Sequence, residues 1–223
     1  MKYYGIKTNP IPSMLAAVFG FVSVCAGAEF TLMDQGKPGC SIVLEKNAGV
    51  VEHHAAAELA AYLARISGGD APEIGTAPKE GTFPVRLRLT DDTRVAEEGF
   101  RLRADTRGLE IAGRQGIGTL YGAYEILKRY GGIRWLAPGA DGEYFTVKPT
   151  LVIPEMDTIS NPSFEFRTIN WAGASILSPI WDSWDWMVRN NLRPFEGHHI
   201  YLNEALHDGL AARGAEIQAG GHC

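Results

Sequence analysis

The chain has 223 residues, 45% of them hydrophobic and 21% charged, and its formal net charge is -5. This composition is typical of a globular protein and excludes a disordered tail, a collagen-like fibre and a disulfide-stapled miniprotein. A pI of about 5.7 argues against nucleic acid as the main partner, because no basic excess offsets phosphate charge. The length allows one or two domains.

Residues 1–28 have the parts of a secretory signal peptide. Two lysines precede a short apolar run, Met14–Val24, and small residues lead up to Ala28. The run is too short to span a hydrocarbon core of about 30 Å as a helix. We therefore expect a secreted or periplasmic protein, cleaved after Ala28 and without a membrane span. A lipoprotein anchored through Cys25 is the less favoured alternative, because Val24 is large for that position.

The sequence predicts neither a metal site nor an organic cofactor. Cleavage of the leader leaves Cys40 and Cys223, which are far apart and form neither a disulfide framework nor a C-x-x-C metal motif. The glycines of residues 113–118 are spaced G-x-x-G-x-G, which differs from the dinucleotide fingerprint G-x-G-x-x-G. We interpret these glycines as the start of a helix.

Alternation and helical periodicity predict a two-layer α/β domain before residue 160. The expected strands cover 41–45, 85–89, 99–104, 109–112, 133–136 and 145–153, and the expected helices cover 53–66 and 114–130. Paired glycines after each helix predict its end. Gly118 and Gly122 predict close approach of the second helix to a sheet, because each costs about 1 kcal/mol relative to alanine. Trp135 is expected to be a buried core residue.

A second unit is predicted to begin at Asn161-Pro162. Its expected elements are a strand over Ser163–Ile169, helices over 181–190 and 201–213, and a strand over Ala215–Ala219. This order is a βαβ unit, whose two strands lack outer neighbours. We expect residues 161–223 to be the incomplete start of a larger domain. The alternative is an extension that docks on the first domain.

The run from Glu97 to Phe145 resembles the N-terminal domain of the alpha-glucuronidase family of glycoside hydrolases. It is also similar to poorly characterised alpha-glucuronidase-like bacterial proteins and, more distantly, to the accessory domain of beta-hexosaminidases. The likeness covers roughly residues 40–170. The segments that carry it are Gly99-Phe100, Ile111-Ala112-Gly113, Gly118–Gly122, Arg134–Gly139 and the helix 56–66 with Gly68-Gly69.

This resemblance implies an accessory α/β domain followed by a (β/α)8 barrel. The chain would then hold a signal peptide (1–28), the accessory domain (29–160) and the truncated β-α-β start of the barrel (161–223). The family's catalytic carboxylates lie on later barrel strands, so no catalytic residue is expected in this chain and the fragment alone should be inactive. The implied whole is a secreted glycoside hydrolase. The alternative is a non-catalytic glycan-binding or surface-associated protein with a degenerate barrel.

Barrel active sites form at the carboxyl ends of the strands. Arg167, Asn170 and Trp171 end or follow the first expected barrel strand, and His222 follows the second. Arginine, asparagine and histidine can hydrogen-bond sugar hydroxyls or a uronate, and tryptophan can stack on a sugar face. We predict that these four residues bind carbohydrate, a uronic-acid-containing or related glycan. The alternative is that Arg167 pairs internally and Trp171 packs under a loop.

Overall fold

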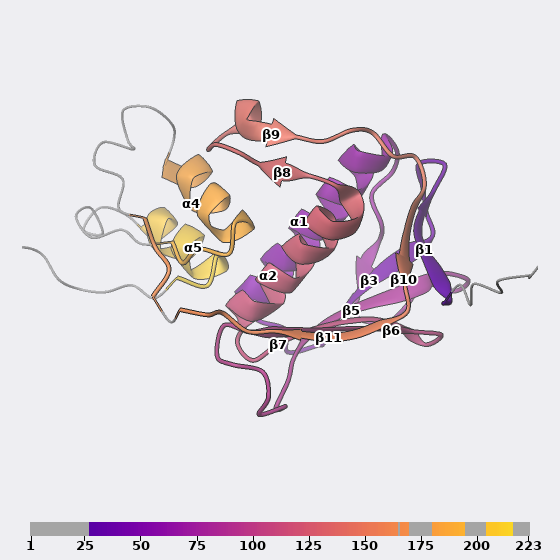
Figure 1. Cartoon of the computed structure of the whole chain (residues 1–223), viewed down its shortest axis with the longest axis horizontal. Helices are drawn as coiled ribbons and strands as arrows, with labels where there is room; N and C mark the ends of the chain where they lie inside the picture. Colours follow the sequence, from indigo (N-terminus) through magenta and orange to yellow (C-terminus); the bar gives the residue numbers. More distant parts are fainter. Residues whose placement is uncertain (1–26, 165, 170–179, 195–203, 216–223) are drawn as a thin grey trace, which may run out of the picture.

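The computed structural model describes residues 27–164, 166–169, 180–194 and 204–215. Its main layer is a six-stranded sheet, which two helices cover on one face (Figure 1). The strands of this sheet are β3 (Cys40–Leu44), β4 (Ile74–Gly75), β5 (Phe83–Leu89), β6 (Phe100–Asp105), β7 (Gly108–Gly113) and β11 (Met156–Ser160). Their order across the sheet is β11-β6-β7-β5-β3-β4. The predicted two-layer α/β architecture is confirmed, and the sheet contains both parallel and antiparallel pairs.

Parallel pairs join β4, β3, β5 and β7, and β6 runs antiparallel between β7 and β11. The predicted hairpin of β6 and β7 is confirmed, with Phe100 opposite Gly113 and Asp105 opposite Gly108. Gly108 has a φ of 137°, a backbone conformation that side chains disfavour. A Cβ there would also lie 2.4 Å from the Pro84 carbonyl oxygen.

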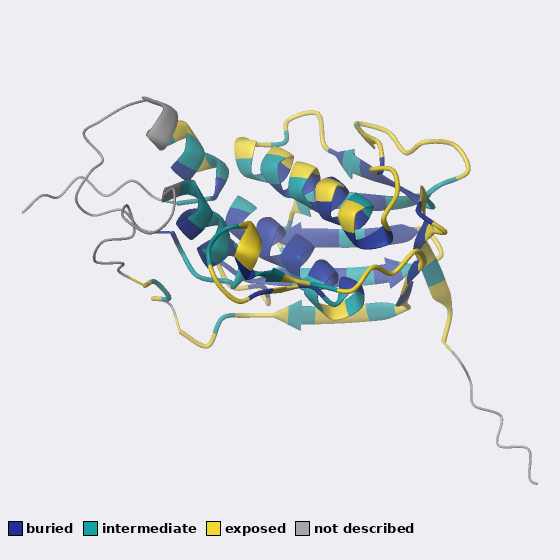
Figure 2. Cartoon of the chain, turned by 90° about the horizontal axis from the view of Figure 1, so that it is seen from above, coloured by how far each residue is buried: buried dark blue, intermediate teal, exposed yellow. Residues whose placement is uncertain are grey.

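The covering helices are α1 (Val50–Ser67) and α2 (Gly116–Ile126), and α2 continues as a π-helical turn, η1 (Leu127–Gly131). Left-handed glycines end them as predicted, with φ of 69° at Gly68 and 80° at Gly132. Helix α1 buries an apolar stripe and exposes its opposite side to solvent (Figure 2). The fully buried side chains of this stripe are Ala55, Ala56, Leu59, Leu63 and Ile66.

Helix α2 lies unusually close to the sheet, as its glycines predict. A Cβ on Gly118 would lie 2.2 Å from the Gly99 carbonyl oxygen, and one on Gly122 would lie 2.7 Å from Ile111 Cγ2. The buried Thr119 hydroxyl, at the helix start, donates to the carbonyl oxygen of Arg88 at 3.1 Å and accepts from the Gly113 amide at 3.1 Å. Helix α2 is therefore fixed to the carboxyl ends of β5 and β7.

Two small sheets complete the first unit. One has the order β10-β1-β2, formed by β1 (Glu29–Asp34), β2 (Lys37–Pro38) and β10 (Leu151–Pro154). The other pairs β8 (Arg134–Trp135) with β9 (Glu143–Tyr144), joined through the short 3-10 helix η2 (Ala140–Gly142). Trp135 is 3% exposed, which confirms its predicted place in the core.

The predicted strand over Ser163–Ile169 is not formed in its described residues, which have no regular secondary structure. Phe164 and Phe166 are 73% and 71% exposed. A parallel strand needs flanking strands for its backbone hydrogen bonds, and no described strand lies beside this segment. The strand expected over Ala215–Ala219 lies outside the described residues except for Ala215, which is irregular.

Two helices follow, α4 (Ile180–Arg189) and α5 (Glu204–Ala212), and both lie within the predicted helical ranges to within a residue. Figure 1 shows them together at one end of the α1–α2 pair, and contacts join α4 to α2 and α5 to α1. We call this contact region between the first unit and the α4–α5 pair the seam.

Candidate functional site

A cavity of about 240 Å³ lies where β6 and α2 meet the chain that follows residue 160. Its lining combines two aromatic rings with charged and amide side chains. The lining residues are Glu98, Phe100, Tyr121, Ser160, Asn161, Pro162, Arg167, Asn190, Asn191 and Leu192. Of the four predicted carbohydrate-binding residues, Arg167 is in this cavity. Asn170, Trp171 and His222 lie outside the described residues.

The Arg167 guanidinium is held by three partners. Its Nη2 pairs with a Glu98 carboxylate oxygen at 2.6 Å, and its Nε and Nη1 donate to the backbone carbonyl oxygens of Asn191 at 3.0 Å and Phe164 at 2.7 Å. Glu98 is 5% exposed and also pairs with Arg193. The internal pairing considered as an alternative for Arg167 is therefore present, and it fastens the chain after residue 160 to the first unit.

Two buried hydroxyl groups beside this arginine form no hydrogen bond of good geometry with the residues that the structure describes. They belong to Tyr121, whose ring lines the cavity 5.7 Å below the Arg167 guanidinium, and to Thr168. Burial raises the pKa of Tyr121 above its usual range and the charge of Glu98 adds to this rise, so the phenol stays protonated. An unpaired buried hydroxyl costs about 1–3 kcal/mol.

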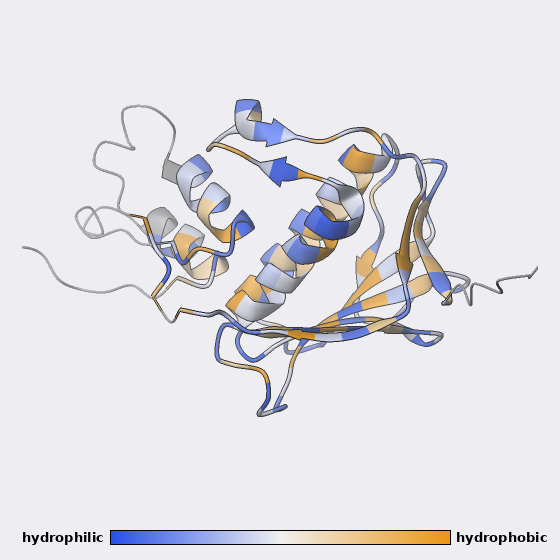
Figure 3. Ribbon diagram, viewed as in Figure 1, coloured by the Kyte–Doolittle hydropathy of each residue, from blue (hydrophilic) through white to orange (hydrophobic). Residues whose placement is uncertain are grey.

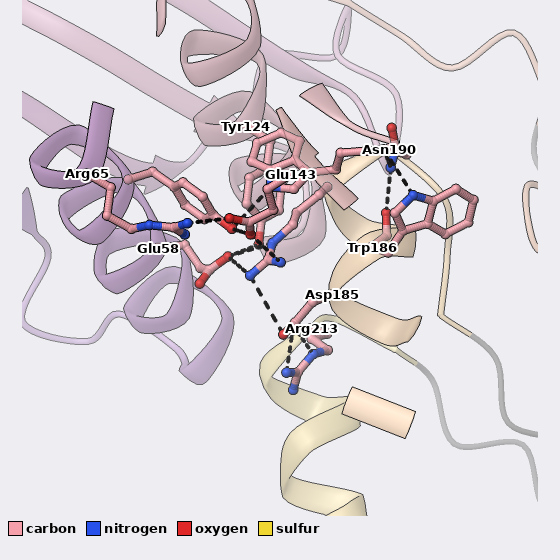
Figure 4. Close-up of polar contacts among 11 residues, drawn as sticks. Glu58, Arg65, Tyr124, Glu143, Asp185, Trp186, Asn190 and Arg213 are labelled. Atoms are coloured by element: carbon pink, nitrogen blue, oxygen red, sulfur yellow. Dashed lines mark hydrogen bonds and ion pairs between the residues drawn. The ribbon is translucent and has the colours of Figure 1, made fainter. Parts of the chain in front are cut away.

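A second polar group lies in the seam, where Figure 4 labels its carboxylates Glu58, Glu143 and Asp185. Its central residue is Arg189 of α4. Its guanidinium pairs with Glu58 of α1 at 2.9 Å and with Glu143 of β9 at 3.5 Å. The Tyr124 hydroxyl donates to Glu58 at 2.9 Å. Arg213, after α5, pairs with Asp185 of α4 at 2.6 Å. These contacts tie α4 to the first unit and α5 to α4.

The remainder of the seam is built around Trp135. Its indole N–H donates to the Tyr62 hydroxyl at 3.1 Å, and its carbonyl oxygen accepts from Trp186 and Asn190 of the second unit at 3.0 and 3.1 Å. The Tyr62 hydroxyl donates to Glu143, which also pairs with Arg65. Burial opposes ionisation of Glu143, but hydrogen bonds from Arg65 and Tyr62 outweigh it and lower its pKa.

The seam residues were not predicted as functional. A signal for them exists in α1, where Glu58, Tyr62 and Arg65 lie at helical spacing beside the apolar stripe. Their partners come from distant parts of the chain, so no local pattern identifies the network. Each buried carboxylate in it is paired with an arginine. The arrangement therefore joins two units, and it does not present an acid and a base to a substrate.

Within the described residues, no group of three or more histidine, cysteine or acidic side chains is placed to hold a metal ion. The same part of the chain has no helix both long enough and apolar enough to cross a membrane.

Several solved structures share this fold. A family GH115 4-O-methyl-alpha-glucuronidase with specificity for decorated arabinogalactans has a TM-score of 0.68 and 18% identity, over 86% of this chain and 29% of that one. A beta-hexosaminidase of Streptomyces plicatus has a TM-score of 0.53 and 17% identity, over 77% and 32%. The GH20 beta-N-acetylhexosaminidase of Streptomyces coelicolor A3(2) has a TM-score of 0.51 and 17% identity, over 75% and 31%.

These comparisons confirm the expected likeness to glycoside hydrolases at the level of the fold. The chain spans about a third of the length of each of these enzymes. No model of a known protein family matches the sequence. No curated protein matches it either.

Proposed function

We propose that this chain is the N-terminal portion of an exported glycoside hydrolase that acts in glycan breakdown. The observation that carries the proposal is the TM-score of 0.68 to a glucuronidase over 86% of the chain. In this proposal residues 1–28 are the signal peptide, 29–160 form the accessory domain, and 161–223 begin a (β/α)8 barrel. The two carboxylates that glycoside hydrolysis requires belong to later barrel strands.

The exposed phenylalanines of the second unit support a continuing barrel. Phe164 and Phe166 lie on the expected first barrel strand and are largely exposed in the chain as described. Neighbouring barrel strands would supply hydrogen-bond partners for the backbone of this segment, and the rest of the barrel would bury its two phenylalanines. The seam, anchored through Arg189, would then orient the barrel against the accessory domain.

The sugar contacts of the proposed enzyme include Arg167, Asn170, Trp171 and His222. For Arg167 the support is its place in a cavity beside the unpaired Tyr121 hydroxyl. Its three contacts within the described residues use three of the five N–H donors of a guanidinium. The two remaining N–H donors can bind hydroxyl or carboxylate oxygens of a uronic-acid-containing glycan.

The reading frame beyond the codon for Cys223 provides one test. The proposal expects it to continue and to encode glutamate or aspartate at the ends of later barrel strands. A continuing barrel without such carboxylates would favour the non-catalytic glycan-binding alternative. A stop codon directly after Cys223 would overturn the proposal.

The role of Arg167 is tested in the complete protein by the kinetics of glycan hydrolysis. Arg167→Gln should raise the KM about tenfold or more, because it removes charge-assisted hydrogen bonds to the sugar. Arg193→Gln removes the other arginine that pairs with Glu98, is not among the residues that line the cavity, and should leave the KM within about twofold of the parent. Equal losses in the two variants would show that Arg167 acts only through the fold.

A further inference from the structure

The face of the main sheet opposite α1 and α2 carries a ladder of arginines. No described helix covers this face (Figure 1), and hydrophilic residues alternate with hydrophobic ones along β5 and β6 (Figure 3). The sheet register places Arg103 of β6 and Arg86 of β5 on either side of Glu110 of β7. The next row of the same face holds Arg101 and Arg88. The ladder therefore crosses three adjacent strands.

Most of these arginines have a carboxylate partner. Arg88 pairs with Glu110 at 2.8 Å and Arg101 with Asp157 at 2.6 Å. At the hairpin turn, Asp105 forms ion pairs with Arg103 at 3.3 Å and with Arg107 at 2.8 Å. These two arginines share one carboxylate, so the positive charge of this corner exceeds the negative charge.

Arg86 is the exception on this face. Its Nη1 donates to the Arg107 carbonyl oxygen at 2.9 Å, and within the described ranges it forms no ion pair with a carboxylate. Glycine at position 108 leaves room for the Arg86 guanidinium, because a Cβ on Gly108 would lie 2.6 Å from Arg86 Nη1. The guanidinium is thus held in place by the hairpin turn while its charge remains uncompensated.

A cavity of about 310 Å³ opens at this guanidinium. Its lining consists of Arg86, Arg103, Asp105, Arg107, Gly108 and Glu110. Three guanidinium groups and two carboxylates give it a net charge of +1 on a chain whose net charge is -5. Hydrogen bonds from Arg107 lower the pKa of Asp105 to about 2, so this carboxylate remains ionised and can accept hydrogen bonds at neutral pH.

We propose that this cavity binds a carboxylate-bearing sugar of an acidic glycan. The identity of the ligand rests on the proposed function. Arg86 takes the sugar carboxylate in a two-pronged hydrogen bond, a geometry that a guanidinium matches and an ammonium does not. Asp105 and Glu110 accept hydrogen bonds from neighbouring hydroxyls, which distinguishes a sugar acid from phosphate. Because the site is open, salt weakens the binding.

Titration calorimetry of the whole mature chain with oligogalacturonate tests this proposal, with the methyl-esterified oligomer as a neutral counterpart. Binding is expected for the acid and not for the ester. Arg86→Gln should weaken binding about fivefold or more, because it removes the charge-assisted bonds. Arg94→Gln makes the same charge change at a loop arginine that pairs with Asp92, and should change binding less than twofold.

Three results would overturn the proposal: equal binding of the ester, equal effects of the two substitutions, or equal competition by double-stranded DNA, which would show a general attraction for polyanions. Unfolding temperatures of both variants show whether each is folded, and Arg103→Gln provides a second test within the cavity. The outcome is independent of the proposed hydrolysis, because the calorimetry measures binding by a chain that is expected to lack the catalytic carboxylates.

Discussion

Arg189 of α4 and Glu58 of α1, which are 131 residues apart in the sequence, form an ion pair of 2.9 Å across the seam. Their side chains are only 12% and 17% exposed. Glu58 also accepts from Tyr124, and Arg189 also reaches Glu143. One charged side chain of the second unit is thereby satisfied by two carboxylates of the first, so the position of α4 depends on the first unit.

Arg189→Met should lower the free energy of unfolding by about 3 kcal/mol, because it leaves the largely buried Glu58 carboxylate without a cation among the described residues. Urea unfolding followed by circular dichroism measures this change. Arg129→Met is the matched control, since Arg129 pairs with Glu125 on the surface and should change the free energy by less than about 1 kcal/mol. In a double-mutant cycle, strictly additive effects of Arg189→Met and Glu58→Gln would contradict a coupled pair.

Tyr121→Phe and Tyr124→Phe remove one hydroxyl each from neighbouring buried positions on α2. Within the described part of the chain the Tyr121 hydroxyl forms no hydrogen bond of good geometry, so its removal should leave stability unchanged or raise it by about 1 kcal/mol. The Tyr124 hydroxyl donates to Glu58, so its removal should lower stability by about 1–2 kcal/mol. Thermal unfolding of both variants provides the comparison. A larger loss at Tyr121 than at Tyr124 would mean that the free hydroxyl is in fact satisfied.

Gly118→Ala should destabilise the protein by about 1–3 kcal/mol, despite the better helix propensity of alanine. The added Cβ would lie 2.2 Å from the Gly99 carbonyl oxygen, so α2 must move away from the sheet. Gly75→Ala is the control, because its nearest neighbour would lie at an ordinary 3.5 Å. Chemical denaturation measures both changes. A Gly118→Ala protein as stable as the parent would contradict the close approach of α2.

His54 makes the stability of the seam depend on pH. Burial lowers its pKa in the folded chain, against a raising effect of Glu58 and Asp185 and with a further lowering by Arg213 and Arg189. A folded pKa below the unfolded value of about 6.5 means that the unfolded chain binds more protons. The stabilising contribution of the neutral His54 is therefore fully present above about pH 6.5. It is expected to decrease as the pH falls from that value toward the folded pKa.

Unfolding measured between pH 7.5 and 5 checks this dependence. His54→Gln should flatten the decline, whereas His53→Gln, at the exposed neighbouring position, should preserve it. An identical pH profile in the parent and in His54→Gln would contradict the assignment.

Local signals predict much of the first unit. The apolar period of α1, the paired glycines that end both helices and the Asp105–Gly108 turn all act over a few residues, and the structure agrees with each. The glycines of α2 even indicate its distance from the sheet. Strand β1 was not predicted, because its partner β10 lies more than a hundred residues away and its short sequence has no clear alternation.

Prediction was weakest where structure depends on distant partners. The strand expected at Ser163–Ile169 has a sequence that alternates phenylalanines with polar residues, but such a strand forms only beside others. Arg167 was predicted to face a ligand, and its pairing with Glu98 follows from contacts that no local pattern contains. The same holds for Arg189, whose partners come from α1 and β9.

The most direct test of the proposed function is an assay of glycan hydrolysis by the protein of the complete reading frame. Purified protein is incubated with glucuronic-acid-bearing arabinogalactan and xylan, and the released sugars are separated and identified. We expect release of a sugar by cleavage of a glycosidic bond, and loss of that release when a barrel carboxylate is replaced by its amide. Binding of these glycans without release of any sugar would contradict the account.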